Sequence, residues 1–213
     1  MNTSKTRQLV VFSAMVAIMI IFSFTPIGSI PIGPLVISLQ VIPMAICAVT
    51  FGPKGGAAAG AVFGILSFLQ CFGIGVPSGM GAVLVGINPF LAFIQRFIPR
   101  LLDGFLIGLI FREMKTKGKG IFLSCAVTGF FSAFLNTVFF MSALVLLFGN
   151  TEYVKGLMGG RNVIAFICAF VGVNAVFEMI SSTLLTGAIG TALYKAKVIT
   201  GEHGVTKETG DEK

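Results

Sequence analysis

Apolar segments long enough to cross a lipid bilayer follow one another along almost the whole chain, from about Leu9 to Tyr194. A membrane-spanning helix needs roughly 20 mainly apolar residues. Of the 213 residues, 55% are hydrophobic and only 11% are charged, whereas about 25% of the residues in a typical soluble domain are charged. So few charges cannot cover a surface that faces water, and lipid is the expected solvent. The sequence therefore predicts an integral membrane protein.

Breaks in the apolar sequence divide it into six predicted helices, so the expected fold class is an all-α integral membrane protein with six transmembrane helices. Residues 1–199 are expected to form one transmembrane domain, and the polar residues 200–213 a disordered cytoplasmic tail. The predicted helices are 9–26, 39–51, 56–72, 89–111, 121–148 and 162–194. They are separated by a Gly- and Pro-rich loop at 28–35, a tight turn at 52–55, a Gly-rich loop at 73–88, a basic loop at 112–119 and a third loop at 149–160.

The basic residues indicate the orientation in the membrane. With six spans, four separate groups of Lys and Arg fall on one side, and only Lys155 and Arg161 fall on the other. Because cytoplasmic loops are enriched in Lys and Arg, both termini are expected in the cytoplasm. The net charge of +7 is attributed to this topology, and no nucleic-acid partner is expected. The four groups are Lys5 and Arg7; Lys54; Arg112, Lys115, Lys117 and Lys119; and Lys195 and Lys197.

Side chains typical of enzyme active sites are missing from the predicted helices. The single histidine, His203, lies in the polar tail, so neither a Ser-His-Asp triad nor a paired-histidine zinc site is expected within the membrane. The four cysteines are far apart and lack metal or redox spacing. The segment GPKGGAAAG lacks the Gly-Lys-Ser/Thr ending of a phosphate-binding loop. The chain is therefore expected not to be an enzyme and to hold no cofactor or metal, so that any ATP is hydrolysed by another chain.

A few polar side chains interrupt the predicted helices, and each is a candidate functional residue because such groups are costly in lipid. At a helical rise of about 1.5 Å per residue, several of them lie at overlapping depths that are reachable from the outside. Three helices are therefore expected to converge on one polar pocket. The candidate substrate-binding residues are Arg96, Arg100, Asn136, Asn174, Asn88, Gln40 and Glu178.

A structural network of charges is the alternative interpretation of these ionisable residues. Arg100 and Asp103 are three residues apart and are able to neutralise each other. Glu178 is able to pair with Arg96 inside the bundle. For Arg96 the ligand role is favoured, because no acidic residue lies one turn away on its own helix.

Two sets of small residues recur at intervals of four, which lets helix backbones approach closely in lipid. The first lies in the predicted helix 56–72 and is attributed to packing within the chain. The second lies in the predicted helix 9–26, where packing and docking on a partner chain both remain open. The two sets are Gly56, Gly60 and Gly64, and Ser13 and Ala17 with Ala14 beside them.

Two segments of the chain resemble one transporter family. The first, IPMAICAVTFGPKGGAAAGAVFGILSF from Ile42 to Phe68, combines a Pro in a helix, a Gly-Pro-Lys turn and a Gly/Ala-rich helix. The second, FIPRLLDGFLIGLIFR from Phe97 to Arg112, carries a Pro-Arg pair followed by a Gly-containing stretch. These features resemble the S components of energy-coupling factor (ECF) vitamin transporters, and the resemblance extends over residues 5–197.

The resemblance implies a six-helix subunit of the cell membrane that binds a vitamin at its outer face, with the loop after the first helix closing over it. It also implies three partner chains, namely an ECF transmembrane coupling subunit and two ATPase subunits. The small face formed by Ser13, Ala14 and Ala17 resembles the surface with which S components dock on the coupling subunit. Ser13 departs from the family pattern, because alanine is usual at that position.

The substrate is predicted from the subgroup that the chain resembles most, which contains pantothenate transporters. The carboxylate of pantothenate suits Arg96 or Arg100. Riboflavin is the alternative vitamin, bound by asparagine amides and phenylalanine rings. A self-sufficient secondary transporter is another alternative, although the two halves of the chain show no visible repeat. A membrane enzyme acting on lipid is the last, and the lack of histidines and the few acidic residues argue against it.

Overall fold

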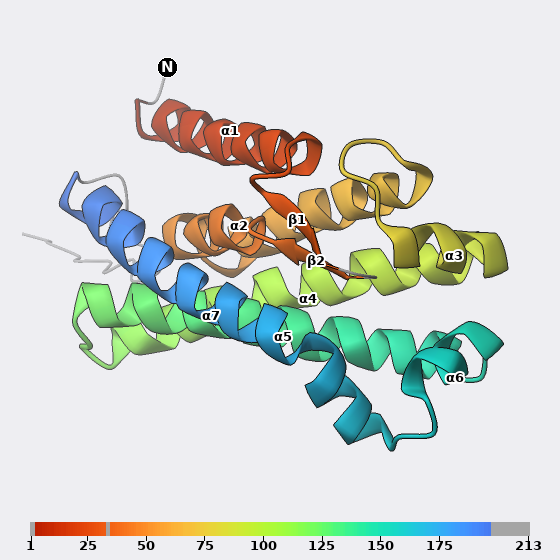
Figure 1. The fold of residues 1–213 in the computed structure, drawn as a ribbon. Coiled ribbons are helices and arrows are strands. Elements are labelled where there is room, and N and C mark those ends of the chain that lie inside the picture. The colour runs from red at the N-terminus through yellow and green to blue at the C-terminus, as the bar shows by residue number, and fades with distance from the viewer. Residues whose placement is uncertain (1–2, 33–34, 197–213) are drawn as a thin grey trace, which may run out of the picture.

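The computed structural model describes residues 3–32 and 35–196 and is a bundle of long helices with one short β-hairpin (Figure 1). The hairpin pairs β1 (Ser29–Ile32) antiparallel with β2 (Leu35–Ser38). Three short elements are the 3₁₀ turn Gln70–Phe72, α3 (Gly79–Ile87) and α6 (Glu152–Met158). The long helices are α1 (Thr3–Phe24), α2 (Val41–Leu69), α4 (Pro89–Thr116), α5 (Ile121–Phe148) and α7 (Val163–Lys195).

α2 consists of two helical halves that reverse direction at Gly52. This residue has a φ of 71° and a ψ of −162°, a conformation that only glycine adopts readily. The two halves pack side by side, because a Cβ built on Gly56 would lie 2.9 Å from the Cβ of Ala48. In a continuous helix, residues eight apart are separated by about 12 Å along the axis. The tight turn predicted at 52–55 is therefore confirmed.

The glycines in the second half of α2 lie directly against α4. A Cβ added to Gly56 would collide with the backbone oxygen of Gly104, and one added to Gly60 with that of Arg100. A Cβ added to Gly64 would lie 2.9 Å from a Cα atom of α4. Helix backbones approach this closely only where side chains are small or absent. The predicted role of these glycines in internal packing is confirmed, and their contacts fix the part of α4 that carries the two arginines.

Small and polar residues also join α5 to its neighbours. A Cβ added to Gly129 of α5 would collide with the backbone oxygen of Ser182 and lie 2.8 Å from the Cβ of Thr186, both on α7. The hydroxyl of Ser132 donates to the carbonyl of Val41 at 3.2 Å, which ties α5 to the first turn of α2. As a result, α2, α4, α5 and α7 surround a common interior (Figure 1).

Three predicted loops contain regular structure. The Gly- and Pro-rich loop 28–35 forms most of the β-hairpin, so the chain is largely helical but not all-α. Pro and Gly disfavour a helix in this segment, and pairing of the two strands provides hydrogen-bond partners for their main-chain N–H and C=O groups. The loop 73–88 contains α3, which begins because Ser78 accepts the N–H of Gly81 at 3.2 Å as an N-cap. Thr151 caps α6 in the same way. In addition, α4 continues to Thr116, through part of the expected basic loop.

Three helices in the described part of the chain are long and apolar enough to cross a membrane. By length and composition these are Val41–Phe72, which is counted as one segment although it reverses at Gly52, Ile121–Phe148 and Asn174–Lys195, and the apolar helix Gln8–Phe24 is shorter. α4 is as long as α5, but charged residues interrupt its apolar sequence. The helices therefore have the apolar character expected of a membrane protein. The predicted tail at 200–213 lies outside the described residues.

Candidate substrate-binding site

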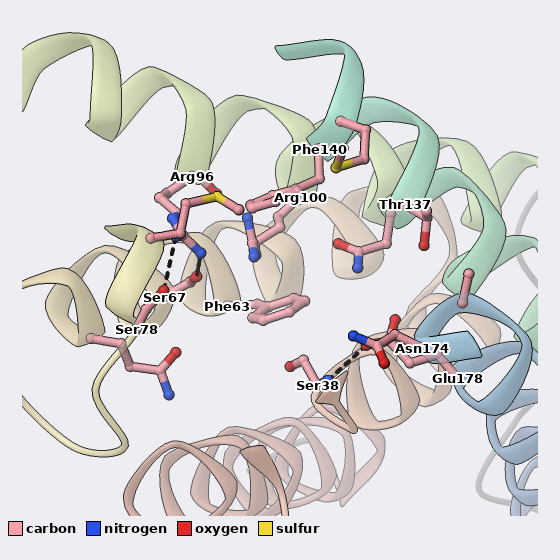
Figure 2. A pocket seen from close by; sticks show the side chains of 15 residues that line it. Ser38, Phe63, Ser67, Ser78, Arg96, Arg100, Thr137, Phe140, Asn174 and Glu178 are labelled. Carbon is pink, nitrogen blue, oxygen red and sulfur yellow. Dashed lines mark hydrogen bonds between the residues drawn. The ribbon is translucent and has the colours of Figure 1, made fainter. Parts of the chain in front are cut away.

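A cavity lies between α2, α4, α5, α7 and the end of β2 (Figure 2). The space between these elements is about 690 Å³ when the part open to solvent is counted with it. The sequence predicted that three helices converge on one pocket, and α4, α5 and α7 do line this cavity. The predicted site residues that line the cavity are Arg96, Arg100, Asn136, Asn174 and Glu178.

Arg96 reaches from α4 to two serines on neighbouring elements. One terminal nitrogen, Nη1, donates to Ser67 Oγ at 3.4 Å, and the other, Nη2, donates to Ser78 Oγ at 3.1 Å. Ser67 lies near the end of α2, and Ser78 caps α3, so the arginine connects three elements at the wall of the cavity. Gly81 leaves room for this arrangement, because a Cβ there would lie 2.9 Å from Nη2 of Arg96.

Arg100 lies one turn further along α4, and a main-chain carbonyl of the preceding turn and two aromatic rings contact its guanidinium. Its Nη1 donates to the carbonyl oxygen of Arg96 at 2.9 Å. Its guanidinium carbon lies 4.5 Å from the ring centre of Phe63 and 5.1 Å from that of Phe140. The guanidinium of Arg96 lies 5.0 Å from the same Phe140 ring. The negative faces of these rings offset part of the cost of burying two cations.

Both guanidinium groups keep unused hydrogen-bond donors. The side chains of Arg96 and Arg100 are only 6% and 5% exposed, and their Nε atoms are buried with no hydrogen-bond partner among the described residues. A guanidinium has five N–H donors; oxygen acceptors occupy two on Arg96 and one on Arg100, and the Cys71 side chain also interacts with Arg96. A buried cation needs an anionic or polar partner to offset its desolvation. This wall of the cavity is therefore suited to bind a carboxylate.

The opposite wall carries a carboxylate and amides. Glu178 is buried, and its Oε1 accepts the backbone N–H of Ser38, the last residue of β2, at 2.7 Å. Asn174 lies one turn before Glu178 on α7, and Asn136 of α5 also lines the cavity. In Figure 2 the two arginines lie on one side of the ring of Phe63, whereas Glu178 and Asn174 lie on the other.

The structural pairings considered for these charges do not form as hydrogen bonds. Both carboxylate oxygens of Asp103 are buried, and within the described part of the chain they have no hydrogen-bond partner. Asp103 therefore does not neutralise Arg100 through a direct hydrogen bond, and it does not line the cavity. The hydrogen bond of Glu178 goes to the hairpin.

Two residues predicted for the pocket, Asn88 and Gln40, do not line it. Asn88 is the N-cap of α4, where its Oδ1 accepts the N–H groups of Phe90 and Leu91, both at 3.1 Å. An asparagine directly before a proline at the first helical position is a strong capping signal, and capping α4 is the role in which the structure places Asn88. Gln40 is buried at the residue before α2.

Several residues of the cavity wall were absent from the predicted set. Ser67 and Ser78 were missed because a single hydroxyl in an apolar or Gly-rich segment carries little sequence signal. The capping position of Ser78, before a run of helix-compatible residues, was the one feature able to reveal it. Phe63 and Phe140 were missed because phenylalanines in membrane helices usually lie in the core or face lipid, and the sequence does not distinguish these positions from a cavity wall.

The predicted docking residues lie on the outside of α1. Ser13, Ala14 and Ala17 are all exposed, whereas Met19 on another face of the helix is fully buried. α1 lies at the edge of the bundle, so this small-residue face is not covered by another helix of the described chain (Figure 1). The position is compatible with either lipid or a partner helix covering it.

The apolar helices and the two arginines at the cavity wall are suited to a membrane protein that takes up a small anionic molecule. The family described as "ECF transporter, substrate-specific component" matches residues 7–190 of the chain. The chain therefore belongs to this family of transporter subunits.

Relatives and one solved structure agree with this family. The chain is 30% identical to the "Pantothenate transporter PanT" of Leuconostoc mesenteroides subsp. mesenteroides, over 91% of this chain and 95% of that protein. It is 27% identical to the "Pantothenic acid transporter PanT" of Lactococcus lactis subsp. cremoris, over 92% and 98% of the two chains. The fold is similar to the crystal structure of an S component for biotin from an ECF-type ABC transporter, with a TM-score of 0.60 and 22% identity over 92% and 94% of the two chains.

Proposed function

We propose that this chain is the pantothenate-binding S component of an ECF-type importer. The observation that carries the proposal is the pair of buried arginines, Arg96 and Arg100, which line the cavity and keep N–H groups without a partner among the described residues. Pantothenate has one carboxylate, which these donors are able to bind with charge-assisted hydrogen bonds. The names of the two relatives support the same vitamin.

The rest of the cavity also suits the chemistry of pantothenate. Its two methyl groups are able to pack on Phe63, Phe140 and Met141, which line the cavity. Its amide and hydroxyl groups are able to bond with Asn136 and Asn174. Riboflavin, the alternative vitamin, carries no charge and would offer no anion to Arg96, whose hydrogen bonds within the described chain go to two serines; a buried cation without an anionic partner is costly.

The proposal includes the position of the chain in the membrane and its partners. Six spans are obtained when the two halves of α2 are counted separately together with α1, α4, α5 and α7. Both termini are then on the cytoplasmic side of the cell membrane. The partners are an ECF transmembrane coupling subunit, which docks on Ser13, Ala14 and Ala17, and two ATPase subunits that supply the energy.

Isothermal titration calorimetry on the detergent-purified chain tests the proposed substrate. Pantothenate, riboflavin and biotin are titrated in parallel, since the fold is shared with an S component for biotin. The proposal predicts one site with high affinity for pantothenate and no measurable heat for the other two vitamins at the same concentrations. High affinity for riboflavin or biotin without affinity for pantothenate would overturn it.

A further inference from the structure

The cavity has a donor side and an acceptor side. On the donor side, Arg96 and Arg100 present N–H groups and are able to accept nothing. On the acceptor side lies the carboxylate of Glu178, with Asn174 beside it (Figure 2). The two sides therefore demand different chemistry from a ligand that reaches both.

Glu178 keeps acceptor capacity after its one hydrogen bond within the chain. A carboxylate offers about four acceptor positions on its two oxygens, and the N–H of Ser38 occupies one of them on Oε1. The side chain is only 6% exposed and lines the cavity, so the ligand is the available source of further donors. A buried carboxylate that lacks donors is destabilised, because it has lost its hydrogen bonds to water.

The same carboxylate holds the β-hairpin at the cavity. Ser38 ends β2, and the following residue, Leu39, closes the base of the hairpin by donating its N–H to Gly28 at 3.0 Å. The bond from Ser38 to Glu178 thus ties the hairpin to α7 at the acceptor side (Figure 2). A ligand that fixes the position of the Glu178 side chain therefore also fixes the position of the hairpin.

The charges that line the cavity indicate which kind of hydrogen-bond donor on the ligand suits Glu178. Two cations and one anion are the charged side chains that line the cavity, namely Arg96, Arg100 and Glu178. Asp103 is a further buried carboxylate that interacts with Arg100 from outside the cavity wall. Among the lining side chains themselves, a ligand with one negative charge and a neutral far end leaves no charge unbalanced. A hydroxyl group meets both conditions, because it donates a hydrogen bond and adds no charge.

We propose that Glu178 is a specificity-determining residue that accepts a hydrogen bond from a hydroxyl group at the end of the ligand remote from its carboxylate, while it holds the hairpin at the cavity. The inference rests on the proposed function, since it takes pantothenate as the ligand. In pantothenate, the terminal hydroxyl is the group that meets this requirement. A site built around a buried polar group rejects an analogue that lacks the matching partner.

The test compares pantothenate with an analogue in which the terminal hydroxyl is replaced by hydrogen. Dissociation constants are measured by calorimetry for the unmodified protein, for Glu178→Met and for Ser182→Ala. Ser182 lies one turn further along α7 and is buried but outside the cavity wall, so it is the matched control. The unmodified protein and Ser182→Ala should bind pantothenate at least about tenfold more tightly than the analogue. In Glu178→Met, which keeps the length of the side chain without its oxygens, the two constants should become nearly equal.

The possible outcomes separate this inference from the proposed function. If the unmodified protein binds pantothenate but not more tightly than the analogue, or if Glu178→Met keeps the full difference, the inference is wrong and the proposed function stands. If Ser182→Ala also binds pantothenate and the analogue equally well, the discrimination depends on the general integrity of α7 and not on Glu178, and the inference is overturned. If the unmodified protein does not bind pantothenate, both proposals fail. If Glu178→Met does not fold, Glu178→Gln replaces it, and its neutral acceptor should reduce the difference between the two ligands.

Discussion

Replacing Arg96 with glutamine tests the donor side of the cavity. In the structure the guanidinium donates to Ser67 and Ser78, faces the ring of Phe140, and keeps its buried Nε without a partner in the described chain. Glutamine is able to keep a neutral hydrogen bond to one of the serines but has no charge for the ligand. A charge-assisted hydrogen bond contributes about 1.5–3 kcal/mol. At about 1.4 kcal/mol per factor of ten, the affinity for pantothenate should fall by about 10- to 100-fold.

Calorimetry on purified Arg96→Gln and on the control Arg161→Gln measures this effect. Arg161 is an exposed arginine before α7 that does not line the cavity, and its replacement should leave the dissociation constant unchanged. Thermal unfolding without ligand shows whether either variant has lost its fold. A folded Arg96→Gln protein that binds pantothenate as tightly as the unmodified chain would refute the assignment of the carboxylate to this wall.

Three further predictions concern docking, packing and topology. Ala17→Trp should leave pantothenate binding intact but abolish uptake by the complete transporter, because Ala17 is exposed on α1; weakened binding would instead indicate a role in the fold. Gly60→Leu should lower the melting temperature and the affinity together, because the new side chain collides with the backbone of Arg100, and an unchanged affinity would argue against this contact. Single cysteines should react with an impermeant thiol reagent from outside at Thr151, and only from inside at Lys54 and Lys117; labelling of Lys117 from outside would contradict the six-span topology.

Periodic and compositional signals in the sequence predicted most of the helices. α5 was predicted with the bounds that it has, and α7 within one residue at each end, because both are long apolar segments between clear breaks. The reversal at Gly52 was predicted because Gly-Pro is a strong turn signal. The β-hairpin, α3 and α6 were not predicted. Short elements of this kind depend on single caps such as Ser78 and on main-chain pairing, which leave little periodicity in the sequence.

The candidate site was predictable where a buried charge made a residue conspicuous. Arg96, Arg100 and Glu178 were selected because ionisable groups are costly in lipid, and all three line the cavity. The sequence could not show that Glu178 bonds the hairpin, because Ser38 lies 140 residues away in the chain. Asn88 was assigned to the pocket on its polarity alone, although the following proline marks it as a helix cap.

Uptake of labelled pantothenate into proteoliposomes tests the central claim most directly. The chain is reconstituted alone and together with an ECF coupling subunit and its two ATPases, with ATP on the cytoplasmic side of the subunits. The account predicts uptake only when the chain, the coupling subunit, the ATPases and ATP are all present, and strong reduction of that uptake in Arg96→Gln at limiting pantothenate. Uptake by the chain alone, or no uptake of pantothenate by the complete assembly while another vitamin is carried, would contradict it.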